Sequence, residues 1–474
     1  MGPQSDRAEG SLVLTDAAAR PGRAAPGRRQ PPEEGVAGLA PRQVAARLLG
    51  AVVDARTPLD ALTDAEHGHP LYRALPPRDR ALVKAILATA LRYRVTIGKL
   101  IARRLDRPLP QNARSLEHIL HVAAAQMLFL DVPDRAAVDV AVAHARSDPR
   151  TMRFAALVNA VLRALGRVKE RALPAELGAN DDAPDWFSAR LKAAYGAERA
   201  AAILAAHRAE PPIDFTVKSD PESWAERFGG IVLPTGSVRV ARLSGPVHDL
   251  PGFAEGEWWV QDAAAALPAR LLGDLHGLSV ADLCAAPGGK TAQLAAAGAR
   301  VTAVDLSRSR LKRLSANLER LKLAAEIVEA DLLAWDPPAL FDAVLLDAPC
   351  SSTGTVRRHP DVPWTKRPDD IARLAGLQRR LLERAIGMVR PGGRVLFSNC
   401  SLDPQEGEDL AAAFLSADTR ACADPIRPDE LPGIAPFITA EGTLRTTPAD
   451  LAGETVALSG MDGFFAARFR RPAP

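Results

Sequence analysis

Apolar residues recur every three or four positions through the first third of the chain. Two such faces are formed by Leu116, Leu120, Ala123, Met127 and Leu130 and by Phe154, Leu157, Val158, Val161 and Leu165. This spacing is typical of amphipathic helices, and strand-like alternation of apolar and polar residues is absent here. We therefore expect an all-α domain over residues 39–172.

A different pattern begins near residue 246, where short apolar runs alternate with helical stretches. The predicted buried strands are Leu278–Cys284, Val301–Asp305, Glu326–Glu329, Ala343–Asp347, Arg394–Asn399 and Phe464–Phe469. The helices predicted between them include Ser309–Leu321 and Ile371–Met388. Strands that alternate with helices predict a parallel, doubly wound, Rossmann-like α/β sheet over residues 246–474.

A mixed segment, residues 173–245, separates these two parts. It holds helical stretches at 184–195 and 197–208 and β-like runs at Ile213–Lys218 and Val238–Leu243. We expect a linker and a small α+β subdomain there. Residues 1–38 are rich in Ala, Pro, Gly and Arg and have little apolar periodicity, so we expect them to form a disordered tail.

Composition narrows the class of protein. With 60 Lys and Arg against 57 Asp and Glu, the formal net charge of +3 permits nucleic-acid binding without indicating it. No apolar run is long enough to span a membrane and no signal peptide is visible, so the predicted location is the cytoplasm, with no membrane partner. The four cysteines form no C-x-x-C pair, which favours reduced thiols over disulfides or a zinc site.

The predicted helical domain carries two basic stretches. They contain Arg92, Arg94, Lys99, Arg103 and Arg104, and Arg150, Arg153, Arg163 and Arg167. Solvated helix faces are the usual explanation of such stretches, and an RNA-contacting face is the alternative. His118 and His121 have a spacing found in metal sites, but no third ligand is in view, so we interpret them as ordinary helix positions.

A loop with two glycines follows the first predicted strand of the α/β part. It runs from Cys284 through Gly288 and Gly289 to Thr291, and glycines there let the backbone approach a ligand closely. The next strand ends at Asp305, where an acid can accept hydrogen bonds from ribose hydroxyls, and Asp331 suits contact near an adenine. The loop has neither the Walker nor the dinucleotide spacing, so it favours S-adenosylmethionine over ATP or NAD.

Two further cysteines follow predicted strands at the same edge of the sheet. Cys350 lies in D-A-P-C-S-S-T-G, which starts at Asp347, and Cys400 lies in S-N-C-S. Open α/β sheets bind their ligands at the carboxyl ends of strands. Two thiols beside a nucleotide-like site suggest covalent chemistry on a pyrimidine ring. For the thiols of Cys284 and Cys422, a role as a small buried apolar group is the better interpretation.

Together these motifs resemble those of the RNA cytosine-C5 methyltransferases. The matching stretches are D-L-C-A-A-P-G-G-K-T, D-A-P-C-S-S-T-G-T-V-R-R-H-P-D-V, S-N-C-S-L-D-P-Q-E-G-E-D and M-D-G-F-F-A-A-R-F. The helical part resembles the NusB-like RNA-binding module of the 16S ribosomal RNA members (RsmB type). The resemblance implies S-adenosylmethionine-dependent methylation of carbon 5 of a cytosine in 16S rRNA or a small-subunit precursor. We expect the enzyme to be a monomer.

The resemblance also implies roles for individual residues. Cys400 is the nucleophile, Cys350 assists product release, and Asp347 contacts the cytosine ring. Lys290 supports the catalytic loop, with a surface position at a helix N-terminus as the alternative. The implied cofactor-binding residues are Cys284, Ala285, Ala286, Pro287, Gly288, Gly289, Lys290, Asp305, Asp331 and Asp347. For the basic run of Arg357, Arg358 and His359, phosphate contact and a solvated loop are both open.

Some alternatives remain at this stage. Asn399 and Ser352 stand where the family usually has Thr and Gly, which affects fine geometry rather than the reaction. DNA cytosine-C5 methyltransferases use the Pro-Cys thiol as the nucleophile, so Cys350 is a rival for that role. The other functions to weigh are a tRNA cytosine-C5 methyltransferase and a non-catalytic RNA-binding protein with a methyltransferase fold.

Overall fold

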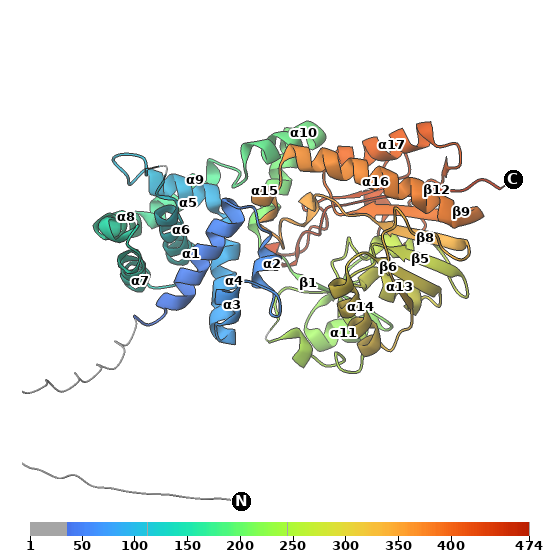
Figure 1. Cartoon of the computed structure of the whole chain (residues 1–474), viewed down its shortest axis with the longest axis horizontal. Helices are drawn as coiled ribbons and strands as arrows, with labels where there is room; N and C mark the ends of the chain where they lie inside the picture. Colours follow the sequence, from blue (N-terminus) through green and yellow to red (C-terminus); the bar gives the residue numbers. More distant parts are fainter. Residues whose placement is uncertain (1–35, 111, 244, 474) are drawn as a thin grey trace, which may run out of the picture.

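The computed structural model describes residues 36–110, 112–243 and 245–473. A helical part lies to the left in Figure 1 and an α/β part to the right, joined by a long helix and a small sheet. The tail expected over residues 1–38 falls almost entirely outside the described residues. No helix within the described ranges is long and apolar enough to cross a membrane.

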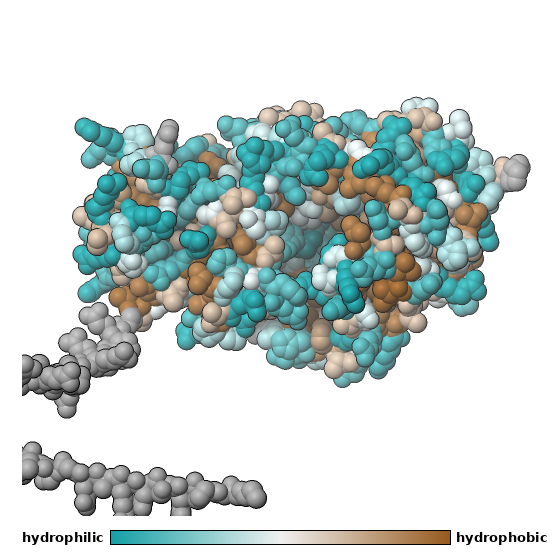
Figure 2. Space-filling model, viewed as in Figure 1, coloured by the Kyte–Doolittle hydropathy of each residue, from teal (hydrophilic) through white to brown (hydrophobic). Residues whose placement is uncertain are grey.

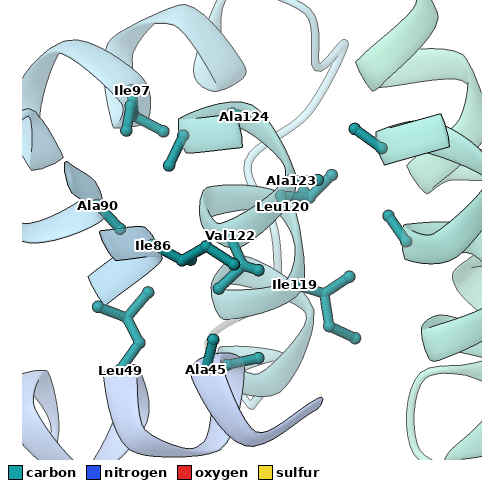
Figure 3. Packing of buried hydrophobic residues seen from close by; sticks show 14 of the residues in the cluster. Ala45, Leu49, Ile86, Ala90, Ile97, Ile119, Leu120, Val122, Ala123 and Ala124 are labelled. Carbon is teal, nitrogen blue, oxygen red and sulfur yellow. The ribbon is translucent and has the colours of Figure 1, made fainter. Parts of the chain in front are cut away.

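The helical part is arranged around the central helix α6. Its helices are α1 (Leu39–Val53), α2 (Leu59–Thr63), α3 (Pro70–Arg73), α4 (Pro77–Arg92), α5 (Arg94–Ala102), α6 (Arg114–Phe129), α7 (Asp134–Ser147), α8 (Ala155–Gly166) and α9 (Lys169–Gly178). α6 is buried on most sides, and its buried residues include the polar side chains of His118, His121 and Gln126 beside its apolar ones. Leu49 of α1, Ile86 of α4 and Ile97 of α5 surround it (Figure 3). The predicted all-α domain is confirmed.

A long helix and a small antiparallel sheet follow. Helix α10 (Asp185–Arg208) changes direction at Gly196, whose φ of 74° lies in the left-handed region that favours glycine. The sheet has the strand order β2-β3-β1-β4, with α11 (Pro221–Phe228) packed against it. Its strands are β1 (Ile213–Val217), β2 (Ile231–Val232), β3 (Val238–Val240) and β4 (Trp258–Val260). β4 therefore lies within the range 246–474 that the sequence assigns to the methyltransferase domain.

The α/β part is built on a larger sheet with the strand order β10-β12-β9-β8-β5-β6-β7, and β11 pairs with β12. The strands are β5 (Ser279–Leu283), β6 (Arg300–Asp305), β7 (Glu326–Glu329), β8 (Phe341–Asp347), β9 (Val389–Asn399), β10 (Cys422–Ala423), β11 (Leu444–Thr446) and β12 (Phe464–Arg470). Strands β5 to β9 are parallel, whereas β12 runs antiparallel to β9. The predicted doubly wound sheet is confirmed.

Helices cover both faces of this sheet (Figure 1). α16 (Pro368–Met388) and α17 (Glu408–Ala417) pack on the face that carries Leu283, Val344 and Leu346. α12 (Leu267–Arg270) and α13 (Gly289–Ala296) pack on the opposite face, and α14 (Arg308–Leu321) packs beside β6 and β7. The chain order reverses between β5 and β8, because β6 and β7 lie on one side of β5 and β8 on the other. Ligands of such sheets bind at this switch point, outside the carboxyl ends of the strands.

Candidate active site

The two candidate thiols meet at the carboxyl ends of neighbouring strands. β8 and β9 are parallel, with Asp347 opposite Ser398, so the turns that follow them leave the sheet at the same edge. Cys350 lies in the first turn and Cys400 in the second. Their Sγ atoms are 3.4 Å apart, and both side chains are half-buried. The structure thus brings together two cysteines that are 50 positions apart in the chain.

This contact separates the acidities of the two thiols. A hydrogen bond from the Cys350 thiol lowers the pKa of Cys400 below its ordinary value. The same hydrogen bond, reinforced by burial, raises the pKa of Cys350 well above its ordinary value. Cys400 is therefore the more acidic thiol of the pair and the one that ionises first, and a thiolate is the nucleophilic form of cysteine.

A buried carboxylate connects the two cysteine turns. Glu406 ends the 3-10 turn Pro404–Glu406 and is 0% exposed. It accepts hydrogen bonds from Ser351 N at 2.9 Å, Ser401 Oγ at 2.6 Å and Gln378 Nε2 at 2.8 Å, and from the Ser351 hydroxyl. Burial raises the pKa of Glu406 against the opposing effect of these hydrogen bonds. Because Ser351 follows Cys350 and Ser401 follows Cys400, one side chain fixes both turns.

Lys290 lies inside the site rather than on the surface. Its side chain is 9% exposed, and Nζ donates to Asp347 Oδ2 at 2.7 Å. The other oxygen of Asp347 accepts from Ser398 Oγ at 3.0 Å, and the ammonium lies 4.8 Å from the centroid of the Phe464 ring. The surface alternative for Lys290 is therefore wrong. These contacts fix the orientation of the Asp347 carboxylate at the end of β8.

The glycine loop connects β5 tightly to α13. Ala285 N donates to the Val304 carbonyl of β6 at 3.1 Å, and Gly288 has a φ of 104°, where other residues are strained. A Cβ at Gly288 would lie 2.9 Å from Leu314 Cγ of α14, so the position also requires glycine for packing. Thr291 Oγ1 donates to the buried carboxylate of Asp282 at 2.6 Å and holds α13 onto the strand.

Acidic residues stand at or just after the carboxyl ends of β6, β7 and β8, three strands of the same parallel sheet. Asp305 ends β6 and accepts from Ala286 N at 3.2 Å, Ser307 N at 2.9 Å and Arg310 at 3.1 Å. Asp331 follows β7 and is exposed, and Asp347 ends β8. A row of carboxylates repels phosphates and attracts hydroxyl and ammonium groups. These residues fit S-adenosylmethionine, which has ribose hydroxyls, an amino group and a sulfonium, better than they fit a phosphorylated nucleotide.

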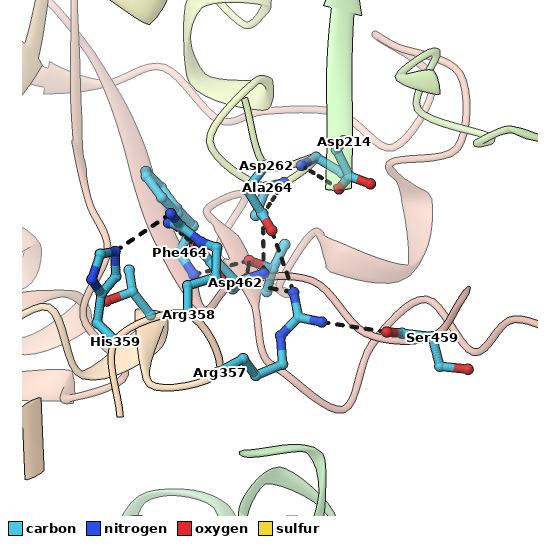
Figure 4. A network of polar contacts seen from close by, with 12 residues as sticks. Asp214, Asp262, Ala264, Arg357, Arg358, His359, Ser459, Asp462 and Phe464 are labelled. Atoms are coloured by element: carbon cyan, nitrogen blue, oxygen red, sulfur yellow. Dashed lines mark hydrogen bonds and ion pairs between the residues drawn. The ribbon is translucent and has the colours of Figure 1, made fainter. Parts of the chain in front are cut away.

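The basic run after Cys350 is largely structural. Arg357 is 2% exposed and lies 3.3 Å from Asp262 Oδ2, with its Nη1 donating to the Ser459 carbonyl (Figure 4). Arg358 Nε donates to Asp462 at 2.9 Å. For Arg357, both a phosphate contact and a solvated loop are therefore wrong, because the guanidinium is buried against carboxylates. The side chain of Arg358 stays 39% exposed, so its contact with phosphate stays a prediction.

Other candidate residues have simpler positions. Cys284 is half-buried at the end of β5, and burial raises the pKa of its thiol. Cys422 is exposed on the short edge strand β10, so the interpretation of its thiol as a buried apolar group is wrong. His118 Nε2 lies 2.7 Å from Asp54, and His121 Nδ1 lies 2.9 Å from the Glu117 carbonyl.

The two basic stretches of the helical part differ in exposure. In the first, Arg94 is buried and paired with Glu117, and Arg92 donates to the Arg357 carbonyl. A solvated face is therefore wrong for these two arginines. In the second, Arg153, Arg163 and Arg167 are exposed. Lys99 and Arg103 of the first stretch are exposed as well, although both lie close to Glu176, so an RNA-contacting face stays open to them and to the second stretch.

Reasoning from the sequence missed the polar groups that support the site. Glu406 stands in the motif S-N-C-S-L-D-P-Q-E-G-E-D, yet nothing in its spacing distinguishes it from the other acids there. Asp262 and Asp462 both bind Arg357 but are 200 positions apart, so only the fold brings them together. The structure assigns Asp262 to this ion-pair network.

Comparison with known proteins identifies the family. The family described as 16S rRNA methyltransferase RsmB/F matches residues 271–470, and the NusB family matches residues 39–167. The ribosomal RNA small subunit methyltransferase B of Vibrio cholerae is 37% identical over 396 residues, which cover 77% of this chain and 91% of that protein. The chain belongs to the 16S rRNA methyltransferase RsmB/F family. It is an S-adenosylmethionine-dependent RNA methyltransferase with a NusB-like domain, as predicted.

Two other comparisons extend over almost the whole chain. The ribosomal RNA small subunit methyltransferase B of Xylella fastidiosa is 37% identical over 452 residues, which cover 91% of this chain and 98% of that protein. The crystal structure of PH0851 is similar with a TM-score of 0.66 and 24% identity, and the match covers 91% of this chain and 99% of that one. The fold is therefore shared across both the helical and the α/β parts of this RsmB/F family member.

Proposed function

We propose that this RsmB/F family member methylates carbon 5 of a cytosine in 16S ribosomal RNA through a covalent bond between Cys400 and the base. The observation that carries this proposal is the 3.4 Å contact between Cys350 and Cys400 beside Asp347. The names of the relatives support the substrate, because they are ribosomal RNA small subunit methyltransferases. The target is 16S rRNA or a small-subunit precursor, and the enzyme acts as a cytoplasmic monomer.

The proposed chemistry begins at the more acidic thiol. The Cys400 thiolate adds to carbon 6 of cytosine, and the electron pair of the 5,6 double bond makes carbon 5 nucleophilic. Asp347 contacts the ring around N3 and N4, held there by Lys290 and Ser398. S-adenosylmethionine, when bound, supplies the methyl group to carbon 5. Cys350, once it has lost its own proton to solvent, takes the carbon 5 proton. The electron pair of that C–H bond restores the 5,6 double bond, and the Cys400 thiolate leaves.

The cofactor is proposed to bind along the carboxyl ends of β5 to β8. The loop Cys284–Gly289 with Lys290 would face it, Asp305 would accept from the ribose hydroxyls, and Asp331 would contact the adenine region. RNA would enter from the face shown in Figure 2, where a hollow opens between the helical and the α/β parts. Hydrophilic residues border the hollow together with apolar ones on its right side.

A denaturing gel with RNA and cofactor tests the assignment of the two thiols. Cys400→Ala should abolish methyl transfer and form no covalent RNA adduct. Cys350→Ala should still attack carbon 6 and should accumulate a protein–RNA adduct that survives denaturation, because release is blocked. An adduct with Cys400→Ala but not with Cys350→Ala would exchange the two roles, as in the DNA enzymes.

The RNA target needs a separate measurement. Methyl incorporation is compared for 16S rRNA and for bulk tRNA, and bisulfite sequencing maps the modified cytosine. Incorporation into tRNA alone would establish the alternative transfer RNA enzyme. Binding of RNA with no transfer to either substrate would favour the non-catalytic alternative.

A further inference from the structure

The segment between Cys350 and α16 connects the active site to the helical domain. We call residues 351–367 the bridging segment; it contains the 3-10 turn Thr353–Thr355 and the short helix α15 (Val362–Thr365). Its first part lies directly on the nucleophile turn. Gly354 N donates to the Cys400 carbonyl at 2.9 Å, and the Gly354 carbonyl accepts from Gly463 N at 2.9 Å. The contact is so close that a Cβ at Gly354 would lie 2.0 Å from the Gly463 oxygen.

The second part of the bridging segment is bound by the helical domain. Leu59 N at the start of α2 donates to Asp361 Oδ2 at 3.0 Å. Trp364 Nε1 donates to the Leu91 carbonyl of α4 at 3.2 Å. The Trp364 ring packs against the core of the helical domain. Hydrogen bonds and apolar packing thus fix this part of the segment on two helices of the other domain.

Charged contacts add to this attachment. The guanidinium of Arg92 in α4 donates to the Arg357 carbonyl at 2.8 Å, and Arg94 lies 5.7 Å from the centroid of the Trp364 ring. Arg92 and Arg94 belong to the basic stretch that the sequence offered as an RNA-contacting face. Arg92 instead donates to the bridging segment, and Arg94, which pairs with Glu117, lies beside the Trp364 ring. This use of two arginines within the protein indicates a role for the helical domain other than RNA binding.

The bridging segment is short and continuously hydrogen-bonded between these two attachments. Arg358 N and His359 N both donate to the Thr355 carbonyl, at 3.0 and 2.8 Å, and Val362 N donates to the His359 carbonyl at 3.1 Å. Val356 and Val362 are buried against α10. Successive turns of this kind, buried and with their backbone groups paired, have little freedom to move independently of their ends.

We infer that the helical domain positions the Cys350–Cys400 pair through the bridging segment, so that it sets the turnover rate as well as the affinity for RNA. This inference rests on the proposed function. Asp361 and Trp364 are positioning residues that act through Gly354 on the nucleophile turn. A domain that only captured RNA would change KM for RNA and leave kcat intact.

Substitution of Trp364 in the full-length chain tests the inference by the split between kcat and KM. Trp364→Phe keeps an aromatic ring but removes the N–H donor to Leu91. We expect kcat at saturating RNA to fall about fivefold to tenfold, the size expected when one partly buried hydrogen bond that holds the bridging segment is lost. KM for RNA should stay within about twofold of the wild-type value.

Asp361 provides a pair of variants that separates positioning from general damage. Asp361→Asn keeps an oxygen that can accept from Leu59 N and should retain most of the wild-type kcat. Asp361→Ala removes that acceptor and should lower kcat as Trp364→Phe does. Arg135→Ala, an exposed position on α7 outside both basic stretches, whose guanidinium lies 3.7 Å from Asp139, is the control and should leave kcat unchanged.

The outcomes distinguish this inference from the proposed function. A wild-type enzyme that methylates no RNA would refute the proposed function itself. An active wild-type enzyme, with unchanged kcat in both Trp364→Phe and Asp361→Ala, would refute only the positioning role. A parallel loss of S-adenosylmethionine affinity, measured by calorimetry, would also refute it, because the catalytic domain would then be unfolding rather than losing alignment.

Discussion

Removing the carboxylate of Glu406 should disturb both cysteine turns at once. The side chain is fully buried and accepts hydrogen bonds from Ser351, Ser401 and Gln378. In Glu406→Ala the serine hydroxyls can rotate toward each other, since Ser351 Oγ and Ser401 Oγ are already 3.2 Å apart. The backbone N–H of Ser351 and the amide N–H of Gln378 have no such replacement and are left unpaired.

The magnitude follows from these two orphaned donors. Each buried donor without a partner costs about 1–3 kcal/mol, so the free energy of unfolding should fall by about 2–6 kcal/mol. Glu406→Gln keeps the volume and one carbonyl oxygen for these two donors, and its amide group can donate to the serine hydroxyls, which also accept. Its cost should therefore be only about 1 kcal/mol. The difference in free energy of unfolding between Glu406→Ala and Glu406→Gln therefore measures the loss of the hydrogen-bond acceptor, whereas the cost of Glu406→Gln measures the loss of the charge.

Urea unfolding and single-turnover methyl transfer measure the two effects. Glu406→Ala should lower the unfolding midpoint and reduce the rate of transfer by about tenfold to a hundredfold, because a displacement of the thiols misaligns the attack. Glu383→Ala is the control, since its partly exposed pair with Arg379 should contribute less than about 1 kcal/mol. The reasoning is refuted if Glu406→Gln is as damaging as Glu406→Ala, or if neither differs from wild type.

Two further predictions concern the cofactor loop. Asp305→Ala should weaken S-adenosylmethionine binding by roughly 1–3 kcal/mol with little change in RNA affinity; unchanged calorimetric affinity for the cofactor would contradict the assignment. Burial raises the pKa of Asp282 from 3.8 to about 7. Between pH 3.8 and 7 the native state therefore binds a proton on Asp282 that the unfolded state does not bind. The stability that this proton binding contributes is complete below pH 3.8 and is lost as the pH rises through 7. Asp282→Asn should remove this pH dependence of the free energy of unfolding, which amounts to at most about 4 kcal/mol between pH 4 and 8. Urea unfolding of both proteins across this pH range measures it, and a difference between variant and wild type that does not change with pH would contradict the prediction.

The sequence predicts the framework of this protein better than its polar interior. The six predicted strands exist, and most are short apolar runs bounded by turn residues. The prediction that Glu326–Glu329 is buried is wrong, because β7 lies at the edge of the sheet and is largely exposed. The pattern does not show that β12 runs antiparallel to β9, since side chains alternate in the same way for either direction. The sequence predicts the positions of Cys350 and Cys400 because each lies in a motif that directly follows a predicted strand.

The burial of charged side chains is what the sequence predicted least well. Arg357 was assigned to solvent or phosphate because arginines are rarely buried, yet Asp262 and Asp462 compensate its charge in the interior. Asp262 and Asp462 are both far from Arg357 in the sequence, so no local sequence pattern predicts that they pair with it. Cys422 shows the opposite error, because it was predicted to be buried and is exposed. A cysteine on a two-residue edge strand has few neighbours to cover it.

The contact between the two thiols affects the order of steps in the proposed catalytic cycle. While Cys400 is a thiolate, the hydrogen bond that Cys350 donates to it keeps the Cys350 proton in place. Once the Cys400 sulfur is bonded to carbon 6 it is an uncharged thioether, and this reason for the raised pKa of Cys350 disappears. Burial still raises the pKa of Cys350, but its proton is easier to lose after the attack than before it. The contact therefore favours the order in which attack by Cys400 comes before release assisted by Cys350.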